Sequence, residues 1–177
     1  ALPPPRATAG FDVGLMELRE TMVRFGSGAS NEDLIAIGSD GFDDIKTGSG
    51  DDRLIGGAGN DTLSGQAGSD IYVVGKDNGH DVITDVESGG SAIDTLLFAA
   101  GIAPGDALIS RNGDDLVVRL AGSDTEVVIE GQFTDSDHGI ERVKFADGTI
   151  WTRTFIEALP VLGTAGADTL NGTDSND

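Results

Sequence analysis

The sequence contains no cysteine, which excludes disulfide bonds, thiolate metal ligands and thiol catalysis. Histidine is also scarce: there are two, and neither has a second histidine at helical spacing, so a zinc hydrolase site is not indicated. The nucleophile turn of serine hydrolases and the glycine loop of phosphate-binding proteins are both absent. We therefore expect this segment to be non-catalytic, with any catalytic domain lying elsewhere in a parent protein.

Basic residues are few. The chain has 11 Lys and Arg residues against 31 Asp and Glu residues, which gives a formal net charge of -20. This charge repels nucleic acid and anionic membrane surfaces, so neither is an expected partner. No apolar run approaches the ~18 residues that a membrane-spanning helix needs, so no membrane span is predicted.

Aspartate and glycine, in contrast, are abundant. Aspartate accounts for 23 of the 31 acidic residues, and its short carboxylate is a ligand that favours hard cations. The 27 glycines argue against a helical bundle, and a hydrophobic content of 38% allows only a modest core. Without disulfides, we expect something else to stabilise that core.

Both ends of the sequence indicate an excerpt from a longer polypeptide. Residues 1–10, ALPPPRATAG, are typical of an extended linker. The last residues, GADTLNGTDSND, stop within a repeating pattern. Neighbouring domains of a larger chain are therefore expected partners.

A short helix is predicted within residues 11–27. Apolar side chains recur at helical spacing at Leu15, Leu18, Met22 and Phe25. A cover over an open end of the core is the favoured role for this helix. A membrane-bound or partner-binding helix is the alternative, which the short length disfavours.

A period of nine residues follows, over units 38–46, 47–55, 56–64 and 65–73. Three positions carry the same type of residue in all four units: glycine at the fourth, aspartate at the sixth and a large apolar residue at the eighth. The fourth positions are Gly41, Gly50, Gly59 and Gly68; the sixth are Asp43, Asp52, Asp61 and Asp70; the eighth are Ile45, Leu54, Leu63 and Tyr72.

Two weaker units flank these four. Residues 28–36 keep Asp33 and Ile35 at the sixth and eighth positions, with Ile37 as an inserted residue before the next unit. Residues 76–84 keep Gly79, Asp81 and Ile83 after a two-residue insertion. Six units are therefore expected between residues 28 and 84.

Each unit combines a tight glycine-aspartate turn with a short strand that carries one apolar side chain. Such a strand buries that side chain only by stacking on other units, and two units make one coil, so unit n lies beside unit n+2. Stacking brings Asp43 close to Asp61 and Asp52 close to Asp70. Each like-charged pair costs on the order of a few kcal/mol unless a divalent cation lies between, and calcium suits such oxygen ligands better than magnesium.

The unit GGAGNDTLS, residues 56–64, resembles the nonapeptide of the RTX, or haemolysin-type calcium-binding, repeat family. The resemblance implies an all-β fold: a parallel β-roll in which several Ca²⁺ ions are held between adjacent turns by sixth-position aspartates and turn carbonyls. A run of glycine-aspartate turns without metal, or a disordered tail, is the alternative. The implied ligands are Asp43, Asp52, Asp61, Asp70, Asp33 and Asp81, with Gly41, Gly48, Gly50, Gly57, Gly59, Gly65 and Gly68 from the turns.

Residues 85–160 change character and predict a small β-rich cap. Alternating runs at 94–98, 115–120, 125–130 and 140–145 are typical of strands, and a short helix is predicted in TRTFIEAL. The segment resembles the region that follows calcium-binding repeats in many RTX proteins. The expected cap core is Leu96, Phe98, Val118, Ile129, Phe145 and Trp151.

The repeat pattern returns near the end of the sequence. Residues 163–171 place Gly166, Asp168 and Leu170 in the nonapeptide frame, and the chain ends at Asp177. We expect residues 161–177 to begin a second, truncated repeat block. Asp168 and Asp177 are its candidate metal ligands.

The favoured function is a calcium-dependent folding module of a larger secreted bacterial protein. The RTX resemblance implies export by a type I system of a Gram-negative bacterium and folding on calcium binding outside the cell. The alternative is a calcium-dependent adhesion module for a polysaccharide or another cell-surface ligand, in a repeat-rich adhesin or biofilm protein.

Overall fold

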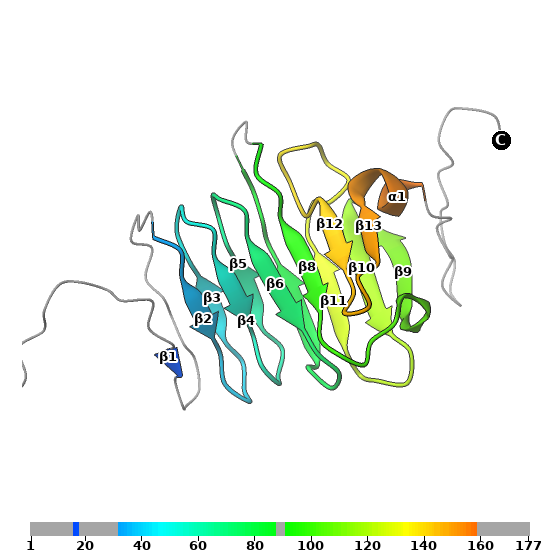
Figure 1. Cartoon of the computed structure of the whole chain (residues 1–177), viewed down its shortest axis with the longest axis horizontal. Coiled ribbons are helices and arrows are strands. Elements are labelled where there is room, and N and C mark those ends of the chain that lie inside the picture. The colour runs from blue at the N-terminus through cyan, green and yellow to red at the C-terminus, as the bar shows by residue number, and fades with distance from the viewer. Residues whose placement is uncertain (1–15, 18–31, 88–90, 159–177) are drawn as a thin grey trace, which may run out of the picture.

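The computed structural model describes residues 16–17, 32–87 and 91–158. Nearly all regular structure in these ranges is β-strand, so the chain is an all-β protein, as its sequence predicts (Figure 1). The first strands after residue 31 are β2 (Ile35–Ile37), β3 (Asp44–Lys46), β4 (Arg53–Ile55), β5 (Thr62–Ser64), β6 (Ile71–Val74), β7 (His80–Ile83) and β8 (Thr95–Phe98).

Successive strands alternate between two sheets. One sheet contains β2, β4, β6 and β8, the other contains β3, β5 and β7, and these neighbours pair in parallel. Leu54 lies opposite Tyr72, and Ile45 opposite Leu63, so residues two units apart in sequence lie side by side. The parallel stack includes β8 and therefore extends past residue 84, where the sequence repeat ends.

The core lies between the two sheets and consists of the apolar residues at the eighth position of the repeat. Ile45, Leu54, Leu63, Tyr72 and Ile83 are fully buried, as the nine-residue period predicts. In the three-residue strands β3, β4 and β5 this side chain is buried, and its two neighbours along the strand are more exposed. In β3, β4 and β5 a single apolar residue per strand enters the core, whereas β6 also buries Val74. Stacking between strands is therefore essential to the core.

The first unit is displaced by one residue from the predicted frame. Ala36, and not Ile35, pairs with Leu54 and is buried. Leu34 consequently occupies the place that the sequence assigned to Asp33, and its N–H donates to Asp52. The strand register has to match the next coil, so Ile37 is the last residue of β2 and is not an insertion between units.

The predicted N-terminal helix is not seen. Within residues 11–27 the structure describes only β1 (Met16–Glu17), a strand that pairs in parallel with β2. The edge strand of a sheet carries unpaired backbone N–H and C=O groups. An additional strand can form hydrogen bonds with these groups directly, whereas a helix cannot. The remainder of the predicted helix and the linker at residues 1–10 lie outside the described residues.

Beyond β8 the chain extends both sheets with parallel and then with antiparallel strands. The elements are η1 (Pro104–Asp106), β9 (Ala107–Asn112), β10 (Asp115–Leu120), β11 (Glu126–Ile129), β12 (Arg142–Lys144), β13 (Ile150–Thr152) and α1 (Arg153–Glu157). β11 and β12 continue the two stacks by pairing in parallel with β7 and β8. β10 and β9, and on the other sheet β13, then add antiparallel. Figure 1 shows these elements together at one end of the stack.

The predicted core of this C-terminal part is largely confirmed. Leu96, Phe98, Val118, Ile129 and Phe145 are buried. Trp151 is only partly buried and packs edge-on against Phe145, with ring centroids 4.7 Å apart. Strand β9, which the sequence did not predict, pairs along the whole of β10. In the described ranges, no helix has the length and apolar character to cross a bilayer.

Two fourth-position glycines have backbone torsions that side chains rarely allow, with φ of 133° at Gly59 and 121° at Gly68. A Cβ atom at Gly59 would lie 2.5 Å from the carbonyl oxygen of Gly41. At Gly68 it would lie 2.1 Å from that of Gly50. The torsion angles and the close stacking of turns therefore both require glycine.

We expect Gly68→Ala to lower the free energy of unfolding of the calcium-loaded chain by about 2 kcal/mol or more, because both strain and collision result. Chemical denaturation followed by circular dichroism measures this. The matched control is Gly105→Ala, where no atom lies within 4 Å of the added Cβ. Equal stability of the two variants would contradict the close approach of the turns.

Candidate calcium sites

The sixth-position aspartates form two buried stacks, one on each edge of the coil. On one edge, Asp61 Oδ1 accepts from the backbone N–H of Asp43 at 2.9 Å, and Asp81 Oδ1 accepts from that of Asp61 at 3.1 Å. On the other edge, Asp70 Oδ1 accepts from the N–H of Asp52 at 2.7 Å. All five carboxylates are buried. The structure thus brings together the aspartate pairs that the repeat period predicts.

The second carboxylate oxygen differs between units. Asp43 Oδ2 accepts from the backbone N–H of Ser39 at 2.6 Å, and Asp52 Oδ2 from that of Gly48 at 3.2 Å. In contrast, Asp61 Oδ2 and Asp70 Oδ2 are buried without any hydrogen-bond partner. A buried carboxylate oxygen without a partner is costly, so these two atoms are suited to a cation.

The backbone conformation of the turn also differs between these units. The two residues that correspond to Ser39 and Gly48 in the later units are Gly57 and Gln66, with φ of 109° and 76°. Neither donates its N–H to the aspartate of its own unit, whose Oδ2 is unpaired. Units 56–64 and 65–73 are therefore the ones whose carboxylates are most open to a metal.

Burial raises the pKa of several of these carboxyls. Loss of hydration raises the pKa of Asp61 to about 6 and that of Asp70 to about 7, and the charges of Asp43 and Asp52 add to the rise. Burial likewise raises the pKa of Asp81 to about 7, with a smaller contribution from Asp61. The backbone hydrogen bonds oppose these shifts without cancelling them. The metal-free stacks therefore hold protons that a cation would displace.

The predicted glycines shape the turns around the aspartates. A Cβ atom at Gly65 would lie 2.0 Å from Asp70 Oδ2, so glycine there lets the carboxylate approach the backbone. The carbonyl oxygens of Gly41 and Gly50 face the turns of Gly59 and Gly68 in the next coil. The Gly48 carbonyl instead accepts from the N–H of Ala67 at 3.1 Å.

One predicted ligand, Asp33, lies apart from the stacks. Asp33 is exposed, and its Oδ1 accepts from the N–H of Asp51 at 3.0 Å, outside the stacked position. A frame displaced by one residue explains this, and Asp33 is therefore not equivalent to Asp52. Asp168 and Asp177 lie outside the described residues.

Sequence reasoning missed Asp94, which continues one stack. Its Oδ1 accepts from the N–H of Asp70 at 2.8 Å, as Asp70 Oδ1 does from Asp52. The signal was present in the sequence, because Asp94-Thr95-Leu96 repeats the triplet at residues 61–63. The long segment between β7 and β8 had broken the nine-residue frame and concealed it.

Stacked, buried aspartates on glycine-rich turns define a calcium-binding repeat module. Residues 37–72 and 161–177 match the family model of the RTX calcium-binding nonapeptide repeat. Residues 115–154 match that of the haemolysin-type calcium binding protein related domain. The chain thus carries RTX repeats and this related domain, which confirms the resemblance seen in the sequence. No curated protein is a significant match to the chain.

The cofactor of such repeats is calcium, bound at several sites. The donor set described above fits this ion, because it consists of carboxylate and carbonyl oxygens. The unpaired oxygens of Asp61 and Asp70 lie on different edges of the coil, and each would hold an ion of its own, with carbonyls of adjacent turns beside it. Bound calcium would supply the positive charge that the buried carboxylates lack.

The raised pKa values predict opposite effects of pH with and without calcium. In the folded chain Asp61, Asp70 and Asp81 have pKa values of about 6 to 7, against an ordinary value of 3.8. Between about pH 4 and about pH 7 the folded state therefore binds more protons than the unfolded state does. The metal-free stability consequently falls as pH rises through this interval. Calcium competes with the protons, so its apparent affinity rises over the same interval.

Urea unfolding in chelator and calcium titration calorimetry, each at pH 5 and pH 8, test this prediction. The stability without metal should be higher at pH 5, and the calcium affinity higher at pH 8. Calcium affinity that is equal at both values would contradict it.

Proposed function

We propose that this chain is a calcium-dependent folding module of a larger secreted bacterial protein. In this proposal residues 28–84 form a calcium-stapled parallel β-roll and residues 85–160 cap it. The repeats resume at residues 161–177, which the second RTX match supports. The observation that carries the proposal is the pair of buried carboxylate oxygens, on Asp61 and Asp70, that have no partner.

The energetic argument concerns what the fold does without metal. The strands β3, β4 and β5 each bury one apolar side chain, so hydrophobic burial per coil is small in this part of the stack. The repulsion between stacked carboxylates opposes folding and costs on the order of a few kcal/mol per pair at intermediate dielectric. Metal-free folding is therefore weak near neutral pH. Calcium removes the repulsion and adds binding energy, so binding and folding become one event.

The location of folding follows from calcium concentration. Extracellular modules typically bind calcium at ~10⁻⁴ to 10⁻³ M. Cytosolic free calcium is far lower, so the module would remain unfolded until export. An unfolded chain without cysteine suits passage through a type I system of a Gram-negative bacterium, after which external calcium would drive folding.

The adhesion alternative requires a surface for a polysaccharide or other cell-surface ligand. Carbohydrate sites use exposed aromatic rings, yet Tyr72 is fully buried and Trp151 packs on Phe145. These two rings support folding. The half-exposed aromatic residues of the described ranges, Phe42 and Phe155, come from separate elements, the turn before β3 and α1. The folding module is therefore the function we favour.

A calcium titration followed by far-ultraviolet circular dichroism tests the proposal. Starting in chelator at pH 8, the chain should pass cooperatively from coil to β-structure on addition of calcium. Magnesium is the control and should not drive this transition, because it demands stricter octahedral geometry and releases its water reluctantly. A chain already β-folded in chelator and unchanged by calcium would overturn the proposed function.

The role of the repeat aspartates is tested by Asp61→Asn. Loss of one charged ligand should raise the calcium concentration at the midpoint of folding about tenfold, which corresponds to about 1.4 kcal/mol. The matched control is Asp40→Asn, which removes the same charge from an exposed turn residue. Equal midpoints for the two variants would show that net charge, and not ligation by Asp61, sets the response.

A further inference from the structure

A cluster of three carboxylates lies where the parallel stack meets the C-terminal elements. Asp70 precedes β6, Asp85 follows β7 and Asp94 precedes β8. One carboxylate oxygen from each lies within 4.8 Å of the others. The three residues are 0%, 1% and 2% exposed. Only Asp70 belongs to the RTX match, so two of the three come from outside the repeats.

The hydrogen bonds of the cluster leave oxygens free for a ligand. Asp70 Oδ1 accepts from the N–H of Asp52, and Asp85 Oδ2 accepts from the hydroxyl of Tyr72 at 2.6 Å. The other oxygen of each, Asp70 Oδ2 and Asp85 Oδ1, is buried without a partner. This observation is independent of the acidic clustering itself, and it indicates that a group with positive charge is required there.

The surroundings of the cluster add to its negative charge. Burial raises the pKa of Asp85 to about 7, and the charges of Asp70, Glu87 and Glu141 add to the rise. Burial also raises the pKa of Asp94 to about 8, with contributions from the charges of Asp85, Glu141 and Asp70. Three carboxylates in so small a volume are unstable together near neutral pH unless a cation or protons compensate them.

We propose that Asp85, which lies outside the repeat match, joins Asp70 and Asp94 in holding one calcium ion at this junction. The separation fits: oxygens bound to one calcium at ~2.3 to 2.6 Å lie at most about 5 Å apart. Carboxylate oxygens alone favour a hard cation over zinc or copper. The site rests on the proposed function, because it forms part of the same calcium-dependent fold.

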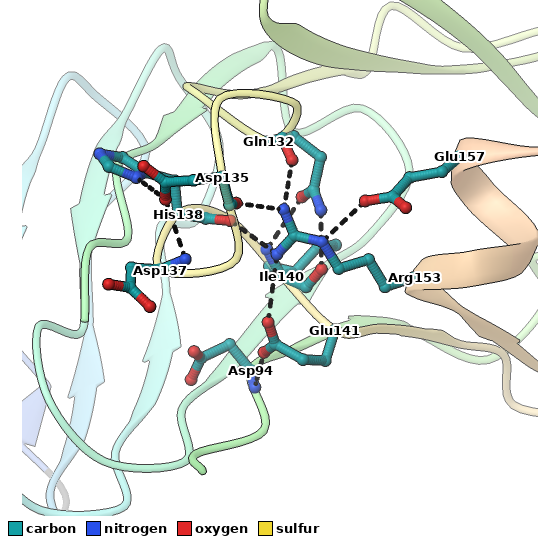
Figure 2. Close-up of polar contacts among 9 residues, drawn as sticks. All are labelled: Asp94, Gln132, Asp135, Asp137, His138, Ile140, Glu141, Arg153 and Glu157. Carbon is teal, nitrogen blue, oxygen red and sulfur yellow. Dashed lines mark hydrogen bonds and ion pairs between the residues drawn. The ribbon is translucent and has the colours of Figure 1, made fainter. Parts of the chain in front are cut away.

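The site connects the stack to the C-terminal elements. The backbone N–H of Asp94 donates to Glu141 Oε2 at 2.8 Å, and Glu141 Oε1 lies 3.4 Å from Arg153 Nη1. Arg153 also donates to the carbonyls of Gln132 and His138. Figure 2 shows Glu141 lying between the Arg153 guanidinium and Asp94. A bound ion would therefore fix Asp94 and, through it, the segment before β12.

A cavity gives access to this region. It has a volume of about 200 Å³, and Glu87, Asp94, Asp137 and Glu141 are among the residues that line it. Asp94 belongs both to this cavity and to the cluster. The acidic lining would attract a cation to Asp94 from solvent.

Calcium stoichiometry of the full chain tests the proposal. Equilibrium dialysis at pH 8 should find one bound ion fewer for Asp85→Asn than for the unsubstituted chain. Asparagine retains an oxygen that can accept from Tyr72, so the substitution removes mainly the charge. The control is Asp124→Asn, at an exposed position in the β10–β11 turn, which should bind the full number. An unchanged number for Asp85→Asn would overturn the junction site.

A crystal structure of the calcium-loaded, unsubstituted chain gives a second test that does not depend on the folding of a variant. Anomalous density within ~2.6 Å of an oxygen from each of the three aspartates would support the site. Filled sites between repeat turns with no ion at the cluster would overturn it and leave the proposed function intact. Failure of the unsubstituted chain to respond to calcium would overturn both.

Discussion

The structure depends on the burial of carboxylates that face one another. Asp61 and Asp70 each give one oxygen to the backbone of the preceding coil and leave the other without a partner. The same hydrogen bonds that hold the coils in register therefore bring like charges together. A cation would resolve this conflict, which suits strands such as β4 and β5 that each bury only one apolar residue.

Glycine and the C-terminal elements make this stacking possible in different ways. Within the repeats, Gly59 and Gly68 allow carbonyls of one turn to meet the backbone of the next. Where the repeats end, antiparallel strands and the contacts of Arg153 replace the glycine-aspartate turns. The chain thus changes from stacked glycine-aspartate turns to side-chain packing around Phe98 and Phe145.

The repeat period predicted much of the fold and of the site, and the exceptions have identifiable causes. Wherever three positions of the unit agree, as around Asp52 and Asp61, the predicted stacking is found. Asp33 was misplaced because a degraded unit does not reveal its frame, whereas the pairing of β2 with β4 fixes it. The helical spacing near Met16 was overridden where backbone groups at the sheet edge pair with β1.

The sequence alone determined which residues repeat, and therefore which aspartates stack, because a fixed period translates directly into neighbours one coil apart. Tertiary structure alone decided which distant residues join them. Asp85 follows no period, and Asp94 repeats the triplet of residues 61–63 only after a break in the nine-residue frame. Asp94 reaches Asp70 because β8 pairs with β6, and Asp85 lies beside both. Contacts between repeat units join residues that are one coil apart in sequence. Contacts at the end of the repeats depend instead on how the following part of the chain packs.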